Sequence, residues 1–148
     1  MVTVRSGQGM AASGGRQPMT HPLVFLHGAF CGGWAWDDFR APFEAAGYRT
    51  HAPDLAGHAD GDDAEYLARL GTKALADDVV RYVRELPAPP VLIGHSLGGL
   101  IAQIAATKIE VAGLVLIAPS APWGVMPTTI EEHGSAVWLT LLGDYWRR

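Results

Sequence analysis

Four short apolar runs alternate with longer helical patterns between residues 22 and 117. The runs cover residues 23–26, 48–52, 91–93 and 114–117, and they are rich in strand-forming side chains. Three of the four are continuously apolar, which is the pattern of parallel strands buried on both faces. The sequence therefore predicts four strands, three of them with the pattern of burial on both faces.

Three helices are predicted between these strands. Apolar residues recur at helical spacing in 36–46, ahead of Gly47, and Pro42 requires that the regular helix begin near it. A second stripe runs through 75–86, after Thr72 as the N-cap and before a proline stop. Residues 97–108 are apolar or small nearly all round, as in a helix buried against a sheet.

The order of these elements is βαβαβαβ, which predicts an α/β fold with a doubly wound, mostly parallel sheet and right-handed crossovers. We expect a flexible lead-in over 1–20, where glycines occur without apolar periodicity, and a core over 21–120. Residues 121–148 carry two overlapping capping boxes and predict the start of a further helical segment.

Composition narrows the functional classes. The chain has 148 residues, 49% of them hydrophobic and 18% charged, which fits one globular domain and excludes a disordered chain. A net charge of −4 argues against nucleic acid as a partner. No apolar run is long enough to span a bilayer, so we expect no stable membrane insertion and a cytoplasmic location.

Metal binding finds little support in the sequence. Cys31 is the only cysteine, so it cannot form an intramolecular disulfide or a zinc cluster, and it is expected to be a small packed side chain. The segment 54–65 holds five acidic residues in twelve, with only fragments of a calcium-loop pattern. We interpret this segment as a solvated surface loop and expect neither a metal nor a cofactor.

The chemistry is predicted around Ser96. Residues 94–98, GHSLG, fit the pattern G-x-S-x-G between an apolar strand and a helix. In that context the serine sits in a strained strand-to-helix turn, the nucleophile elbow, where Gly94 and Gly98 relieve steric crowding. The alternative is a glycine-rich turn with an incidental serine. We take Ser96 as the candidate catalytic nucleophile.

A serine nucleophile also needs donors for the developing oxyanion. The helix starting at Leu97 points backbone N–H groups at the elbow, and the loop after the first strand offers a second amide from Ala29 or Phe30. Gly28 lets that backbone turn closely. For His27 we favour a structural role in the loop, because the base follows the serine in this architecture.

In these motifs the chain resembles the α/β-hydrolase superfamily. The segments HGAFCGGWAW, APDLAGH, GHSLGG and LVLIAPSAP occur in that superfamily's order, and the resemblance covers about residues 22–122. The tryptophan-bearing loop is similar to that of small esterases, methylesterases and hydroxynitrile lyases. The resemblance implies an acylated Ser96, oxyanion donors at Leu97 and Ala29, and cofactor-free hydrolysis of carboxylic esters, amides, lactones or thioesters.

Large aromatic residues are candidates for an acyl pocket, with ordinary packing as the alternative for each one. They are Phe30, Trp34, Trp123 and Trp138.

The sequence offers no convincing acid and base for proton transfer. In this fold the acid and then the base follow the serine, and His133 is the only histidine after Ser96. It falls in the predicted helix beyond the last strand, where the family begins its cap. The acids after Ser96 are Glu110, Glu131, Glu132 and Asp144. We therefore expect the triad acid and base to lie outside this chain, which resembles an N-terminal part truncated within the cap region.

Two functional hypotheses follow. The first is a serine hydrolase acting on a small carboxylic ester through an acyl-Ser96 intermediate, with the isolated chain weakly active or inactive; a lyase or acyltransferase on the same scaffold is not separated from it. The second is a non-catalytic or partner-completed fragment that pairs through the edge at 114–117, as a homo-oligomer or with a complementing C-terminal half.

Overall fold

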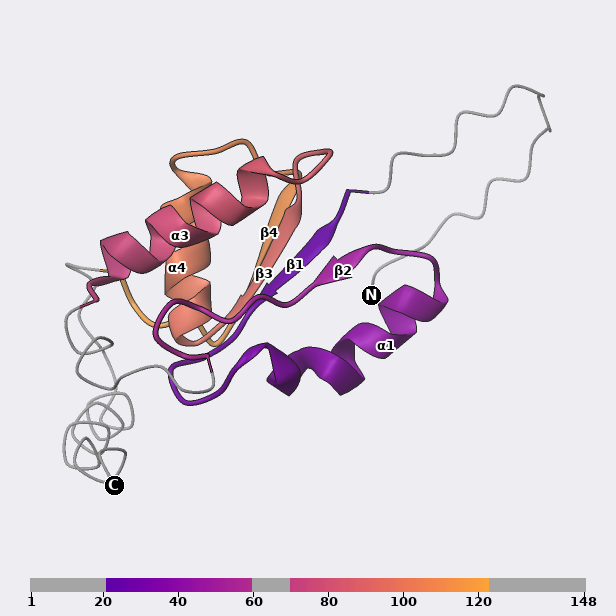
Figure 1. Cartoon of the computed structure of the whole chain (residues 1–148), viewed down its shortest axis with the longest axis horizontal. Coiled ribbons are helices and arrows are strands. Elements are labelled where there is room, and N and C mark those ends of the chain that lie inside the picture. Colours follow the sequence, from indigo (N-terminus) through magenta and orange to yellow (C-terminus); the bar gives the residue numbers. More distant parts are fainter. Residues whose placement is uncertain (1–20, 60–69, 123–148) are drawn as a thin grey trace, which may run out of the picture.

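The fold is a four-stranded parallel sheet with helices on both faces (Figure 1). The structure is a computed structural model, and it describes residues 21–59 and 70–122. Its strands and helices alternate along the chain as β1 (Leu23–Leu26), α1 (Asp37–Ala45), β2 (Thr50–His51), α3 (Thr72–Arg84), β3 (Val91–His95), α4 (Leu97–Ala106) and β4 (Gly113–Ile117). A short 3-10 helix, η1 (Gly33–Trp36), leads into α1. The predicted α/β fold is confirmed.

The strand order is β2-β1-β3-β4, so the two central strands are β1 and β3. All three pairings are parallel, and Leu26 at the end of β1 lies opposite Gly94 in β3. Parallel strands bring their carboxyl ends to one edge of the sheet. The loop after β1 and the turn after β3 therefore emerge side by side, where open α/β sheets usually bind ligands.

Alternate side chains of β1 point to opposite faces of the sheet, as the pleat requires. Val24 and Leu26 pack beneath α3 and α4, in a cluster that includes Ile101, a fully buried residue of α4. Leu23 and Phe25 belong to a second cluster on the α1 face. Figure 1 shows α3 and α4 together on one side of the sheet and α1 on the other. The sheet is thus covered on both faces at its centre.

The first helix begins earlier than its proline predicts. It starts at Asp37 and runs through Pro42, so the expectation that the helix begins near Pro42 was wrong. The preceding 3-10 turn already sets the chain into helical geometry, and Gly47 follows the helix with φ 87°. A residue in that left-handed region commonly follows a helix end, as the sequence predicted.

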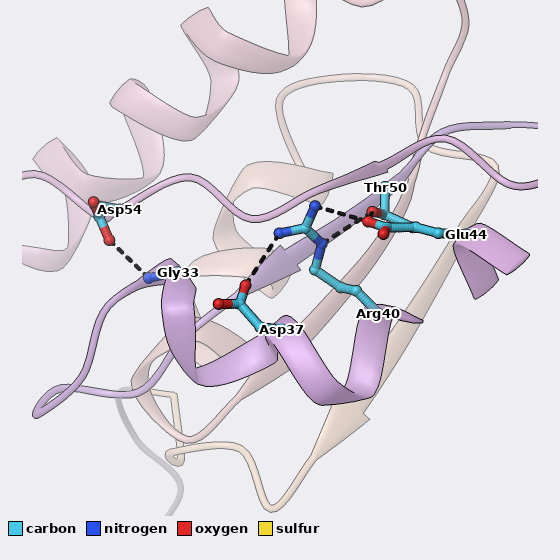
Figure 2. Close-up of polar contacts among 6 residues, drawn as sticks. All are labelled: Gly33, Asp37, Arg40, Glu44, Thr50 and Asp54. Carbon is cyan, nitrogen blue, oxygen red and sulfur yellow. Dashed lines mark hydrogen bonds and ion pairs between the residues drawn. The ribbon is translucent and has the colours of Figure 1, made fainter. Parts of the chain in front are cut away.

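Polar contacts tie α1 to the edge strand β2 (Figure 2). Arg40 donates from Nε to Thr50 Oγ1 at 2.9 Å, and its guanidinium pairs with Glu44 at 2.9 Å and with Asp37 at 3.6 Å. The Thr50 hydroxyl donates to Glu44, and this bond, with the guanidinium, holds the pKa of Glu44 below its ordinary value. These contacts anchor a helix that has no fully buried residue.

Two finer expectations need correction. Gly71, and not Thr72, is the N-cap of α3, because the Gly71 carbonyl accepts the first helical bonds, from Ala74 and Leu75. The strand β4 is not buried on both faces: Leu114, Val115 and Leu116 are 39%, 46% and 38% exposed. Among the described residues only β3 pairs with β4, and a strand with one neighbour keeps its outer side open.

The predicted lead-in over 1–20 and most of the segment 121–148 lie outside the described residues. Within the described part of the chain, none of the helices has the length and apolarity that crossing a bilayer requires.

Candidate active site

Ser96 occupies the turn between β3 and α4 in a conformation that side chains rarely adopt. Its backbone has φ 51° and ψ −118°, while α4 begins at the next residue. The turn is held from both directions, because Ser96 N donates to Ile117 O at 3.2 Å and Ser96 O accepts from Ser120 N at 2.9 Å. The strained serine turn that the sequence predicted is therefore present.

Glycine is required on both sides of this turn because backbones pass too close for a Cβ. A Cβ on Gly94 would lie 2.4 Å from Gly98 O, and one on Gly98 would lie 2.1 Å from Leu26 O. Real Cβ atoms do not approach backbone oxygens this closely. The two glycines thus let α4 start directly against the ends of β1 and β3, as expected.

The loop after β1 reaches Ser96. A Cβ built on Gly28 would lie 3.5 Å from Ser96 Cβ, so the structure brings the predicted oxyanion loop and the predicted nucleophile together. Leu97 is the first residue of α4, and its N–H has no acceptor within the helix. Ala29 is half-buried, whereas the Phe30 side chain is 50% exposed. The geometry places both halves of the predicted oxyanion site at one corner of the sheet.

His27 uses both ring nitrogens for structure. Nδ1 donates to Gly28 O at 2.8 Å, and Nε2 accepts from Leu55 N at 2.9 Å. This pattern requires the neutral ring, and burial lowers the pKa of His27 accordingly. With 1% of its surface exposed and no nitrogen left for a substrate, His27 is a loop-bracing residue. This arrangement matches the structural role that the sequence favoured.

Sequence reasoning missed how the loop after β2 braces the loop after β1. Asp54 Oδ1 accepts from Gly33 N at 2.7 Å (Figure 2), and His58 Nε2 lies 3.0 Å from Ala29 O. With the Leu55 bond to His27, three contacts join the segment 54–58 to the segment 27–33. Both segments follow the carboxyl ends of neighbouring strands, and the one signal in the sequence was that both belong to motifs of the α/β-hydrolase resemblance.

A mostly apolar cavity of about 380 Å³ lies beside the oxyanion loop. Gly28, Cys31, Trp36 and His95 are among its lining residues. Cys31 is half-buried there, and its thiol approaches Gly28 O at 3.6 Å. Trp34 is 69% exposed and lies outside this lining. Trp123 and Trp138 fall outside the described residues.

One candidate for the triad acid is excluded by its position. Glu110 follows α4 and precedes β4, which places it at the amino end of the sheet, opposite Ser96. His133, Glu131, Glu132 and Asp144 lie outside the described residues. Within the described segments, no group of three histidine, cysteine or carboxylate side chains is arranged to hold a metal ion.

The comparisons with known proteins agree with this geometry. A sequence profile described as "Alpha/beta hydrolase family" matches residues 23–148. The chain belongs to the α/β-hydrolase family. A pyrethroid hydrolase of Sphingobium wenxiniae is 35% identical to this α/β-hydrolase chain over 118 residues, covering 76% of the chain and 41% of the relative. Salicylic acid-binding protein 2 of Nicotiana tabacum is 38% identical over 91 residues, covering 58% and 34%.

A solved structure extends the likeness to three dimensions. A pyrethroid hydrolase from Sphingobium faniae JZ-2 superposes with a TM-score of 0.59 at 32% identity, covering 74% of this α/β-hydrolase chain and 46% of that one. The chain thus spans less than half the length of these relatives.

Proposed function

We propose that this chain contributes the nucleophile and the oxyanion site of an ester hydrolase that forms an acyl-Ser96 intermediate. The observation that carries the proposal is the strained Ser96 turn, set directly beside the Gly28 backbone. The similarity to a pyrethroid hydrolase and to methylesterases supports an ester of a carboxylic acid as the substrate class.

The proposed reaction runs in two steps. Ser96 Oγ attacks the ester carbonyl, a base accepts its proton, and the carbonyl oxygen becomes an oxyanion facing the N–H groups of Leu97 and Ala29. The tetrahedral species collapses with departure of the alcohol, which takes up a proton, and water then hydrolyses the acyl-enzyme. One well-placed oxyanion donor contributes about 10²–10³-fold to such a rate.

We propose that neither proton-transfer partner comes from the described residues. His27 is already committed on both ring nitrogens, and Glu110 lies at the opposite end of the sheet. In the family that the chain resembles, the acid and then the base follow the serine on later strands. On that ground we also propose that the 148-residue chain by itself retains at most the oxyanion and binding contributions, about 10³–10⁴-fold over water.

Labelling with a fluorophosphonate tests the proposal, because its phosphorus is attacked by an activated serine and its oxygen occupies the oxyanion site. We expect slow, stoichiometric labelling that peptide mapping assigns to Ser96, with none at that peptide in Ser96→Ala. Labelling no faster than in the urea-unfolded chain, or labelling of another residue, would overturn the nucleophile assignment. The proposal that the chain lacks its acid and base is tested by the turnover of nitrophenyl acetate. A rate more than about 10⁴-fold above that in water, abolished by Ser96→Ala, would overturn it.

A second proposal concerns the exposed face of β4. Leu114, Val115 and Leu116 are all more than a third exposed along a strand that pairs on one side only among the described residues. Such an edge favours pairing with another strand. We infer that this edge pairs in the assembled protein, either with a complementing C-terminal half or with a second copy of the chain.

Light scattering after size exclusion tests edge pairing for the full chain. The expected result is a dimer or larger species that Val115→Lys converts to monomer without loss of helical circular dichroism. A monomer at all concentrations would contradict self-pairing. If a separately produced C-terminal segment from a longer relative also failed to bind, the edge proposal would be abandoned.

A further inference from the structure

His58 contacts the loop that contains the candidate oxyanion donors. It is half-buried at the end of the segment 54–58, with Nε2 3.0 Å from Ala29 O and Nδ1 3.2 Å from Ala56 O. A neutral imidazole has a single N–H and donates to one of these carbonyls at a time, whereas the protonated ring donates to both. The shorter contact is the one to Ala29.

The planarity of the peptide bond gives this contact its meaning. In a trans peptide the C=O and N–H groups point in opposite directions, so fixing the carbonyl also fixes the amide of the next residue. His27 holds the Gly28 carbonyl and thereby orients the Ala29 N–H. His58 holds the Ala29 carbonyl and thereby orients the peptide plane that carries the Phe30 N–H.

Ala29 therefore lies between two peptide planes, each held by a different histidine. The two rings also contact each other edge to face, with 5.2 Å between their centroids. One histidine comes from the loop after β1 and the other from the loop after β2. His58, 29 positions away in the sequence, thus holds one of the two peptide planes that flank Ala29.

We propose that His58 is a positioning residue of the oxyanion site: its Nε2–H holds the Ala29 carbonyl and so restrains the loop residue whose own N–H faces the oxygen that develops on the substrate. This inference rests on the proposed function of Ser96. His58 does not touch the reacting atoms. Its loss leaves Ser96 and Leu97 in place and loosens the second donor.

Two amide substitutions separate the two contacts of His58. In His58→Gln the amide nitrogen takes the place of Nε2 and keeps a donor for Ala29 O. In His58→Asn it takes the place of Nδ1 and keeps a donor for Ala56 O. Both variants are polar and neutral, so each is the control for the other, and a purely local role in bracing the segment 54–58 would favour Asn.

The first readout is fluorophosphonate labelling of the full chain at Ser96, analysed as a maximal rate and a half-saturating concentration. We expect His58→Asn to lower the maximal rate about tenfold, the effect of one lost hydrogen bond, with the half-saturating concentration unchanged. We expect His58→Gln to stay within about twofold of the wild type. Equal rates in the two variants, or a lower rate in Gln than in Asn, would overturn the proposal.

The second readout does not depend on Ser96 chemistry. Amide resonances and hydrogen exchange of Ala29 and Phe30 are measured by NMR in the wild type and in both variants. Faster exchange at these amides in His58→Asn, with recovery in His58→Gln, is expected. Absence of wild-type labelling would defeat the proposed function alone, whereas amides unaffected in His58→Asn would defeat the role of His58.

Discussion

The backbone at Ser96 sets up a test of whether the turn stores strain. A non-glycine residue at φ 51° and ψ −118° occupies a sparsely populated region, which costs about 1–3 kcal/mol. Ser96→Gly removes that strain but lowers the free energy of unfolding by about 0.5–1 kcal/mol, because glycine loses more conformational entropy on folding. Ser96→Ala keeps the strain and also removes the hydroxyl. We therefore expect Ser96→Gly to be more stable than Ser96→Ala by about 1 kcal/mol, and by no more than about 2.5 kcal/mol.

Urea unfolding followed by far-ultraviolet circular dichroism measures this difference. Both variants lack the hydroxyl, so their comparison isolates the backbone conformation. Ser120 provides the matched control, since positive φ among described non-glycine residues is confined to Ser96 and Ala118. At Ser120 the order must reverse, with Gly less stable than Ala by about 0.5–1 kcal/mol.

The reasoning fails if Ser96→Gly is equal to or less stable than Ser96→Ala while the Ser120 pair behaves as expected. That result would mean that the surrounding structure relaxes around an alanine at the elbow and that no strain is stored there. An equal m-value in the two variants is required for the comparison to count, because a changed slope reports a changed unfolded state.

Three further outcomes are expected from the same unfolding assay. Gly98→Ala should lower the free energy of unfolding by at least about 1–3 kcal/mol, because the added Cβ would lie 2.1 Å from a backbone oxygen. In the control variant Gly113→Ala, the added Cβ would lie at an ordinary distance of 3.5 Å from the Val91 side chain, so the change should be less than about 0.5 kcal/mol. Ile101→Ala should cost about 2–5 kcal/mol, since that side chain is fully buried, and a smaller loss would show a loosely packed α4 interface. Burial lowers the pKa of His27, so as the pH falls the unfolded chain takes up a proton at this residue before the folded chain does. The contribution of His27 to the free energy of unfolding is therefore complete above about pH 6.5 and decreases below it. His27→Gln should lose less stability than the wild type between pH 7.5 and 5.5, and parallel losses would contradict the neutral buried ring.

The elbow was predictable because its sequence signals are local, although Leu26, Ile117 and Ser120 also hold the turn. A strand, a close-packed glycine pair and a helix follow one another within 91–106, so the sequence pattern contains the turn that strains Ser96. The position of the loop after β1 beside Ser96 was predictable from the parallel arrangement of β1 and β3, whereas its oxyanion role stays a prediction. The sequence did not decide whether Ala29 or Phe30 supplies the second N–H donor.

The bracing contacts were not predictable, because they depend on which strands become neighbours. Asp54 was interpreted as part of a solvated acidic loop, yet its carboxylate accepts the Gly33 amide. His58 ends the APDLAGH segment, but nothing in that segment indicated a contact with the loop after β1. Only the placement of β2 beside β1 brings these residues to the oxyanion loop, and that placement is a property of the whole sheet.

The apolar pattern of β4 alone indicated burial on both faces, which the structure does not show, whereas the open edge expected at 114–117 is present in the part of the chain that the structure describes. Its apolar run indicates a strand whose side chains are stabilised by burial, but the run does not indicate which segment of the protein buries them. Exposure of Leu114, Val115 and Leu116 reflects the neighbours available and not the character of the strand itself.

The central pairing of β1 with β3 also bears on how the site forms in time. Leu23 pairs with Val91, so a long stretch of chain must close before the first bond between these strands can form. Such closure is entropically costly and makes parallel sheets slow to fold. Gly28 and Ser96 meet only once this pairing is complete. Appearance of a reactive serine during refolding would therefore mark the last step, later than the helical signal of α3 and α4.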